Sequence, residues 1–159
     1  MQFIEDNNIN SQYITRYPNH NSSIALAFLD QHKNATYTFY KDFPENRLQG
    51  NTPIVKKDEI VLFGSSFALQ LDIRNNLIEF LKLSYSNNAI IIYDLNIRKK
   101  SGDAVEKIKK MVRENIRFAT IIRASDEDIY NLNYTNIEDF YKEIENNKVL
   151  IVTRNKSAT

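Results

Sequence analysis

The sequence contains no cysteine, and its two histidines, His20 and His32, are too few for a metal cluster. The absence of thiols excludes a disulfide framework and thiolate zinc sites, and it fits a reducing, intracellular compartment. Only three glycines, Gly50, Gly64 and Gly102, occur, and they stand far apart. A dinucleotide-binding or P-loop motif needs several glycines close together, because backbone must approach phosphate without a Cβ in the way. The sequence therefore has no phosphate-cradling glycine loop.

Two further absences concern membranes and nucleic acids. No stretch approaches the roughly 18 apolar residues of a membrane span, and residues 1–6 lack the basic-then-apolar order of a signal peptide. The 21 Lys and Arg nearly balance the 20 Asp and Glu, so no global field attracts nucleic acid or an anionic membrane. We expect a cytoplasmic protein that binds neither. Its 159 residues suffice for one domain with a substantial core.

The first part of the chain, residues 1–50, has the pattern of a small antiparallel β unit. Residues 12–17 and 24–29 are rich in apolar residues and are predicted to be strands. Residues 30–34 have turn chemistry, and residues 35–40 alternate small or polar residues with aromatic ones. Residues 24–40 are therefore expected to form a hairpin.

From residue 51 to residue 159 the pattern changes to strands that alternate with helices, which predicts an α/β fold with a mostly parallel sheet. Strands are expected at 60–63, 89–93, 120–123 and 148–153, helices at 73–84 and 102–117, and helical segments between 126 and 146. No helix follows the last apolar run, 149–152, so we expect one face of the sheet to be bare. Residues 3–8 resemble the end of a helix.

Polar clusters follow the four predicted strands of this region. They are Gly64-Ser65-Ser66, Asp94 to Arg98, Ser125 to Asp128 and Thr153 to Lys156. Because neighbouring parallel strands end at one edge, we expect the clusters to share a rim where a ligand could bind. Structural alternatives stay open: a tight turn at Gly64, a loop salt bridge with an Asx turn at Asp94, a capping box from Ser125 to Asp128, and a solvated tail.

Phe39-Tyr40-Lys41-Asp42 ends the predicted hairpin with aromatic rings and a cation. Rings that cover sugar C–H faces, with a charged group that fixes hydroxyls or a carboxylate, suit a polyol ligand. The alternative is that these aromatics pack against neighbours or make an oligomer contact.

The order of these motifs resembles the PfkB or ribokinase-like carbohydrate kinases, and within them the fructokinase and 2-keto-3-deoxygluconate kinase branch. Residues 24–41 resemble the family's lid hairpin. Asp94 to Arg98 is similar to the family's Asp-Pro-Asn-x-Arg segment, with leucine in place of proline. Residues 123–128 resemble its Lys-x-Asn-x-x-Glu segment, with serine for asparagine and aspartate for glutamate. Residues 152–156 resemble its Val-Thr-x-Gly segment without the glycine.

The resemblance implies a ribokinase-like, Rossmann-like α/β fold with a β lid over residues 1–50 and a partial kinase core over 51–159. It also implies transfer of the γ-phosphoryl group of ATP to a sugar hydroxyl with magnesium, and a homodimer contact through the lid. Carried over by position, the sugar-site residues are Phe39 and Lys41 in the lid, Arg98 as an anchor for the sugar, and Asp94 and Asn96 as supports of its loop.

On the nucleotide side, the resemblance places Ser125 and Asp128 in the metal-phosphate region, without direct metal ligation, and Thr153 near the nucleotide. Keto-acid kinases favour arginine where the lid here has Lys41. Lysine cannot make the bidentate contact of arginine with a carboxylate, so a neutral sugar such as fructose is favoured.

Two family motifs are absent from the chain: the glycine pair of the sugar site, and the glycine-alanine-glycine-aspartate motif that supplies the anion hole and the catalytic base. No catalytic residue is therefore expected here, and we expect an internal piece of about half an enzyme that is inactive alone. One alternative is a noncatalytic module that binds sugar or dimerises. A nucleotide-binding α/β domain of another class is disfavoured by the missing glycine loop.

Overall fold

The computed structural model describes residues 2–31, 35–44, 47–98 and 102–154. The chain divides into two compact units, Met1–Asn51 and Thr52–Thr159. Their boundary falls where the sequence pattern changes from antiparallel β to alternating strands and helices.

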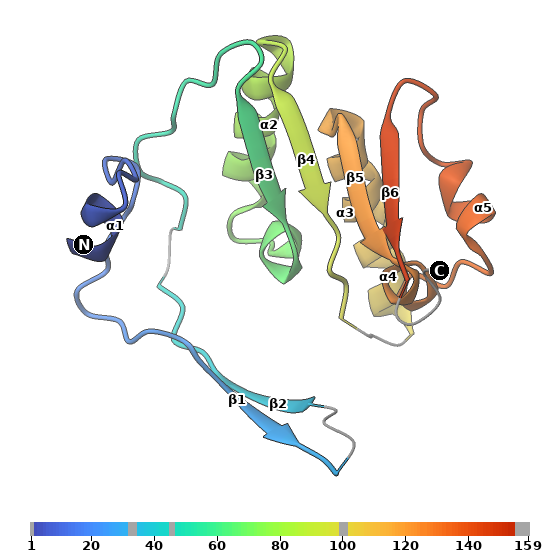
Figure 1. The fold of residues 1–159 in the computed structure, drawn as a ribbon, viewed down its shortest axis with the longest axis horizontal. Helices are drawn as coiled ribbons and strands as arrows, with labels where there is room; N and C mark the ends of the chain where they lie inside the picture. Colours follow the sequence, from blue (N-terminus) through green and yellow to red (C-terminus); the bar gives the residue numbers. More distant parts are fainter. Residues whose placement is uncertain (1, 32–34, 45–46, 99–101, 155–159) are drawn as a thin grey trace. The chain divides into compact units, whose positions relative to one another are not determined.

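The first unit contains a short helix and a hairpin (Figure 1). Helix α1 spans Gln2–Asp6, and strands β1 (Ile24–Leu29) and β2 (Ala35–Tyr40) pair antiparallel, with Ile24 opposite Tyr40. The predicted hairpin is confirmed, and residues 32–34 of its expected turn lie outside the described residues. The hairpin is exposed along nearly its whole length.

The predicted strand at residues 12–17 is wrong. This segment forms turns and irregular backbone, and the Ile14 N–H donates to the Ser11 carbonyl at 3.0 Å. The Asn10 side chain accepts the Gln12 N–H at 3.0 Å. Local hydrogen bonds of this kind satisfy the backbone in place of a strand partner, and no described strand pairs with the segment.

The second unit is built on a parallel sheet in the order β3 (Ile60–Gly64), β4 (Ile90–Asp94), β5 (Ile121–Ser125) and β6 (Val149–Thr153). Between these strands run η1 (Ser66–Leu69), α2 (Arg74–Ser86), α3 (Asp103–Phe118), α4 (Asp126–Asn131) and α5 (Ile137–Tyr141). The predicted α/β fold and its parallel sheet are confirmed. None of the helices in the described ranges is long and apolar enough to cross a membrane.

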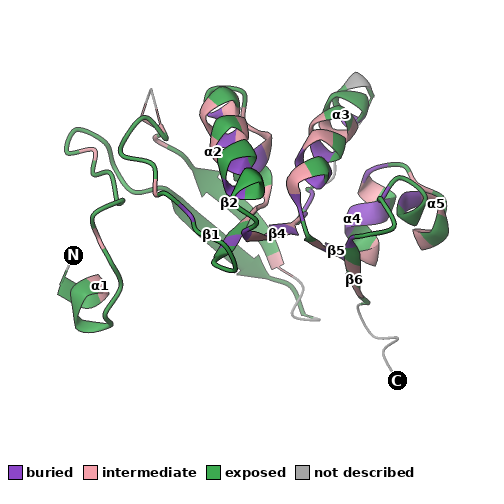
Figure 2. Ribbon diagram, turned by 90° about the horizontal axis from the view of Figure 1, so that it is seen from above, coloured by how far each residue is buried: buried purple, intermediate pink, exposed green. Residues whose placement is uncertain are grey.

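The core of this unit lies on one face of the sheet. Ile91, Tyr93 and Ile122 are fully buried there beneath the helices, which all lie on one side of the sheet in Figure 2. On the opposite face Leu62 is 71% exposed and Ile151 is 47% exposed. Among the described residues of this unit no helix covers that face.

Candidate functional site

The carboxyl ends of the four strands form one polar rim. Gly64 pairs with Asp94, Asp94 with Arg123, and Ser125 with Thr153. Because all four strands run parallel, their carboxyl ends lie along the same edge of the sheet. The expectation that the polar clusters share a rim is confirmed for their described residues, and Asn155 and Lys156 of the last cluster lie outside these.

At the first position of the rim, the end of β3 packs closely against the backbone of β4. A Cβ on Gly64 would overlap with the Asp94 carbonyl oxygen, so no larger residue fits. The Ser65 N–H donates to that same oxygen at 2.9 Å. Ser65 has φ 60° and ψ −170°, a conformation that only glycine adopts without strain. The chain therefore makes a sharp, strained turn beside Asp94, as expected for a tight turn at Gly64.

Asp94, Arg123 and Thr153 form a ladder across three strands at the rim. One guanidinium nitrogen of Arg123 lies 3.0 Å from Asp94 Oδ1, and the other donates to Thr153 Oγ1 at 2.9 Å. Both partners of the ion pair are 38% exposed, so solvent reaches the ladder. The salt bridge that the sequence left open at Asp94 is real, and its cation comes from β5. Arg123 links the predicted sugar loop to Thr153.

Beyond Asp94 the loop alternates buried and exposed residues. Leu95 is fully buried and Ile97 is 5% exposed, whereas Asn96 and Arg98 are exposed. Asn96 has φ 43°, a left-handed conformation that asparagine tolerates better than most residues. The two apolar side chains therefore anchor the loop in the core and leave Asn96 and Arg98 exposed.

The capping box predicted at the start of α4 is confirmed. Ser125 Oγ accepts the Asp128 N–H at 3.1 Å, and Asp128 Oδ2 accepts the Ser125 N–H at 2.7 Å. Asp128 is only 4% exposed, and its other oxygen accepts the Ile97 N–H. Both carboxylate oxygens are thus engaged inside the chain.

These contacts bear on the magnesium implied by the resemblance. Magnesium binds carboxylates together with several waters, which requires oxygens open to solvent. The Asp128 carboxylate is buried, and the described ranges contain no group of three His, Cys, Asp or Glu that could hold a metal. The described residues therefore do not make a magnesium site on their own.

On the hairpin unit, side chains of alternating residues form a row of rings and cations. Tyr37 stacks on Phe39 with ring centres 5.9 Å apart, and Lys41 Nζ lies 5.4 Å from the Phe39 ring centre and 5.6 Å from that of Phe43. Arg47 lies 4.4 Å from the Phe43 ring centre. Phe43 and Arg47 are not among the site residues predicted from the sequence. The spacing 39, 41, 43 along an extended segment could have indicated Phe43.

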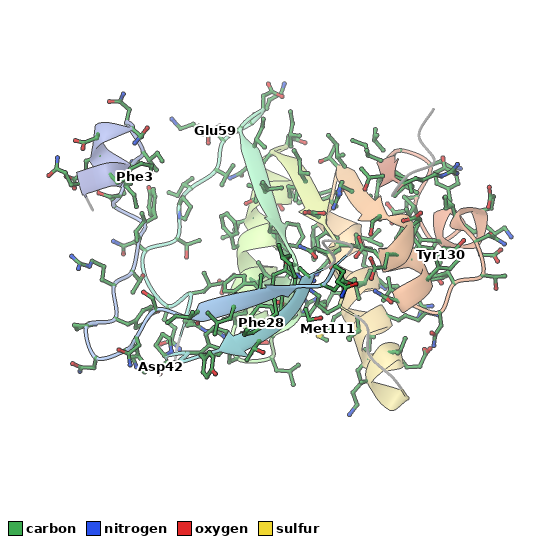
Figure 3. The ribbon with its side chains drawn as sticks, turned by 60° about the horizontal axis from the view of Figure 1, so that its bottom comes forward. Phe3, Phe28, Asp42, Glu59, Met111 and Tyr130 are labelled. Carbon is green, nitrogen blue, oxygen red and sulfur yellow. The ribbon has the colours of Figure 1, made fainter. Side chains whose placement is uncertain are left out.

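Asp42 has a structural role beside this row. It accepts hydrogen bonds from the Asn21 N–H at 2.9 Å and from His20 Nδ1 at 3.0 Å, and these contacts lower the pKa of its carboxyl. Phe28 on β1 and Asp42 after β2 are marked in Figure 3. Asp42 thus ties the segment before the hairpin to the segment after it.

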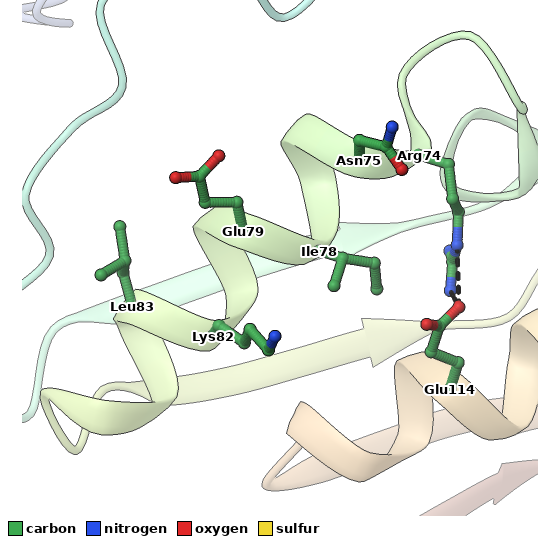
Figure 4. A pocket seen from close by; sticks show the side chains of 7 residues that line it. All are labelled: Arg74, Asn75, Ile78, Glu79, Lys82, Leu83 and Glu114. Atoms are coloured by element: carbon green, nitrogen blue, oxygen red, sulfur yellow. Dashed lines mark hydrogen bonds and ion pairs between the residues drawn. The ribbon is translucent and has the colours of Figure 1, made fainter.

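A groove of about 490 Å³ lies between α2 and α3, away from the predicted site residues. Arg74 on α2 points toward Glu114 on α3 (Figure 4), and its Nε lies 3.1 Å from that carboxylate. The guanidinium also donates to Asn115 Oδ1 at 2.7 Å and to the Ala68 carbonyl at 3.0 Å. Arg74 therefore joins η1 and the two helices, and it has little capacity left for a ligand.

The predicted site residues fall in two groups. Phe39 and Lys41 lie together on the hairpin unit, and the remaining ones lie along the rim of the second unit. Within the rim, Arg123 is hydrogen-bonded to both Asp94 and Thr153. Asp128 accepts a hydrogen bond from the loop that carries Asn96 and Arg98.

Comparison with known proteins matches residues 1–158 to the family described as pfkB family carbohydrate kinase. The chain belongs to the pfkB family of carbohydrate kinases. Solved structures of three sugar or nucleoside kinases have the same fold. The fructokinase from Vibrio cholerae O395 in apo form has 20% identity and a TM-score of 0.72, with 96% of this chain and 54% of that chain covered. The fructokinase from Xylella fastidiosa has 16% identity and a TM-score of 0.76, with 99% and 53% covered.

The third structure is aminoimidazole riboside kinase from Salmonella enterica, with 16% identity, a TM-score of 0.68, and 96% and 51% covered. At these identities the likeness shows the fold. The pfkB chain spans about half the length of the solved structures that it matches. The comparison with curated proteins finds no match. The family resemblance read from the motifs is confirmed.

Proposed function

We propose that this pfkB-family protein takes part in ATP-dependent transfer of a phosphoryl group to a hydroxyl of a fructose-like sugar. The observation that carries the proposal is the loop from Asp94 to Arg98. It leaves β4 at the carboxyl rim, where α/β sheets bind ligands, and it has Asn96 and Arg98 exposed. In this role Arg98 donates hydrogen bonds to sugar hydroxyls, and Asp94 and Asn96 hold the loop.

Two observations support a sugar and a nucleotide as ligands. The rings and cation of Phe39 and Lys41 form an exposed surface that suits the C–H faces and hydroxyls of a sugar. A structure of the Vibrio cholerae fructokinase contains fructose, ADP and calcium ion. In the present protein we assign the ADP side of the reaction to the rim near Ser125 and Thr153.

Residues 1–159 supply recognition in this proposal and no catalytic base. Phosphoryl transfer depends on positioning and on stabilisation of developing charge. The glycine-alanine-glycine-aspartate motif that would provide both is not in this sequence. We therefore expect residues 1–159 to bind sugar without appreciable turnover.

The test measures two properties of residues 1–159 and of a version extended at both ends by the flanking coding sequence. Fructose binding is measured by calorimetry, and ADP release is measured with ATP, magnesium and a panel of sugars. We expect fructose binding by both chains and sugar-dependent ADP release by the extended chain. An extended chain without sugar-dependent ADP release contradicts the kinase proposal.

A matched pair of variants tests the assigned loop. Arg98→Ala removes the proposed sugar anchor, and Arg117→Ala removes an exposed guanidinium from α3. We expect Arg98→Ala to weaken fructose binding by about tenfold or more, because a hydrogen bond to a charged group contributes about 1.5–3 kcal/mol. Arg117→Ala should leave the affinity unchanged, and equal effects of the two variants would contradict the assignment.

A second candidate function is a noncatalytic module that dimerises through the hairpin. The observation in its favour is the exposure of Phe28 (60%), Leu29 (66%) and Tyr40 (61%) on a sheet of only two strands, which is marginally stable by itself. Sedimentation of residues 1–159 distinguishes the two candidates. A dimer that Phe28→Ser converts to a monomer, together with no fructose binding, favours the module.

A further inference from the structure

Helix α4 binds both backbone polar groups of Ile97. The Ile97 N–H donates to Asp128 Oδ1, and Asn131 Nδ2 donates to the Ile97 carbonyl at 2.9 Å. Asp128 and Asn131 are three residues apart and therefore lie on one face of the helix. One loop residue is thus bound through both its N–H and its carbonyl by two side chains of one helix.

These two hydrogen bonds fix the loop beyond the end of the sheet. The last backbone bond to β5 is made by the Leu95 N–H, which donates to the Arg123 carbonyl at 3.0 Å. Ile97 is 5% exposed and Asp128 is 4% exposed, so their polar groups need partners within the protein. The side chains of α4 take over the role that a neighbouring strand plays for residues 90–94.

We call the hydrogen bonds of Ile97 with Asp128 and Asn131 the clamp. The clamp determines where the neighbouring side chains lie. Asn96 directly precedes the bound N–H, and Arg98 directly follows the bound carbonyl. Both are exposed, while Ile97 between them is buried. A shift of the Ile97 backbone would therefore move both exposed residues together.

We propose that Asp128 and Asn131 are positioning residues that place Asn96 and Arg98 for sugar binding. The inference rests on the proposed function in that the loop is taken to hold the sugar. It assigns Asp128 a role different from the one implied by the resemblance, since its carboxylate holds the loop and the cap of α4 and is turned away from the solvent. Asn131 has no part in any motif that the sequence suggested.

The same carboxylate joins two parts of the rim. Asp128 Oδ2 accepts the Ser125 N–H at 2.7 Å and the Ser125 Oγ–H at 2.8 Å, while Oδ1 accepts from the sugar loop. Ser125 lies on the side assigned to the nucleotide. One side chain, Asp128, therefore connects Ser125 with Ile97.

The experiment uses variants of Asn131, because loss of Asp128 would also remove the helix cap. Asn131→Leu removes the donor at similar size, and Asn131→Asp replaces it with an acceptor that repels the Ile97 carbonyl. The matched control is Asn136→Leu, which removes the cap of α5, where Asn136 Oδ1 accepts the Asp139 N–H at 2.8 Å. Fructose and ATP binding are measured by calorimetry on residues 1–159, and amide exchange is followed for residues 95–98.

We expect both Asn131 variants to speed amide exchange in residues 95–98 and to weaken fructose binding by about tenfold, with ATP binding changed by less than about twofold. Asn136→Leu should leave all three unchanged. Unchanged exchange overturns the clamp, and faster exchange with unchanged fructose affinity overturns the positioning role. If the unsubstituted chain binds no fructose, the proposed function fails, and the exchange measurement still decides whether α4 holds the loop.

Discussion

The two faces of the four-stranded sheet have similar sequences and different surroundings. In β4, Ile91 is fully buried under the helices, and its neighbour Ile92 is only partly buried on the other face. Both faces carry isoleucine, leucine and valine, as is typical of parallel strands covered on both sides. The composition of a strand therefore indicates burial, but it does not say which protein segment provides the cover.

The largest expected loss of stability comes from a comparison of neighbouring isoleucines on the two faces. Ile91→Ala leaves a cavity in the core and should lower the free energy of unfolding by about 4 kcal/mol. Ile92→Ala removes the same atoms from a face that no described helix of this unit covers, and it should cost less than about 1.5 kcal/mol. Urea unfolding of residues 1–159 followed by circular dichroism measures both.

A second pair in the next strand is the control for this comparison. Ile122 is fully buried, whereas Ile121 lies on the same face as Ile92. Ile122→Ala and Ile121→Ala should differ in the same direction. Equal losses for the members of both pairs would mean that the second face is also covered in solution.

The next largest effect concerns a buried lysine on the covered side. Lys148 has a side chain that is 3% exposed, and its Nζ donates to the carbonyls of Ile116 (2.9 Å), Arg117 (2.7 Å) and Ala119 (3.1 Å). It therefore caps the last turn of α3, where a positive charge also favours the helix dipole. Lys148→Met should destabilise the chain by about 2–3 kcal/mol, because three carbonyls lose a charged donor. Thermal and urea unfolding measure the loss.

An exposed lysine provides the control. Lys142 makes one ion pair with Asp139 at 2.8 Å, and its side chain is 74% exposed. Lys142→Met should change the free energy of unfolding by less than about 0.5 kcal/mol. A loss as small for Lys148→Met would show that water replaces its three hydrogen bonds at no cost.

The fold could be predicted because local patterns and burial agree along most of the chain. Strands β3 to β6 are short β-branched runs, and the helices between them begin and end within a few residues of the expected positions. Residues 12–17 were mistaken for a strand because an apolar pattern does not show whether a partner strand exists. In the structure the Ile14 and Gln12 N–H groups instead donate local hydrogen bonds to Ser11 and Asn10.

The features of the site that follow from strand direction and local spacing could be predicted. The side-chain contacts between distant segments could not. The shared rim follows from the parallel direction of the strands. The capping box follows from the spacing of Ser125 and Asp128. The contacts of Arg123 and Asn131 bridge segments about 30 residues apart, and no local rule pairs such positions. The spacing of Asp128 and Asn131 on one helix face was the available signal for the clamp.

A smaller effect on the covered side depends on pH. Arg113 on α3 binds Glu143 through two hydrogen bonds of 2.8 Å, and these lower the pKa of Glu143 from its ordinary 4.5. The carboxylate is therefore more stable in the folded state. Its contribution is complete above about pH 4.5 and is lost as the pH falls through the lowered pKa. Since Arg113 is half exposed, we expect less than about 1 kcal/mol.

The measurement compares the unsubstituted chain with Glu143→Gln. The difference in the free energy of unfolding should be largest near about pH 7 and should shrink towards zero as the pH falls well below the ordinary glutamate pKa. A difference that is constant over this range would show that the pair contributes through packing and not through charge.

The smallest expected change in stability lies on the bare face, and it decides whether that face is bare in solution. Leu62 is 71% exposed on β3, an edge strand of the described sheet. Leu62→Lys removes apolar surface from contact with water and adds a charge that opposes edge-to-edge association. We expect the free energy of unfolding to change by less than about 0.5 kcal/mol, while binding of a hydrophobic dye and aggregation both decrease. If Leu62→Lys instead costs as much as Ile91→Ala, another polypeptide segment covers this face, and the difference between the two faces disappears.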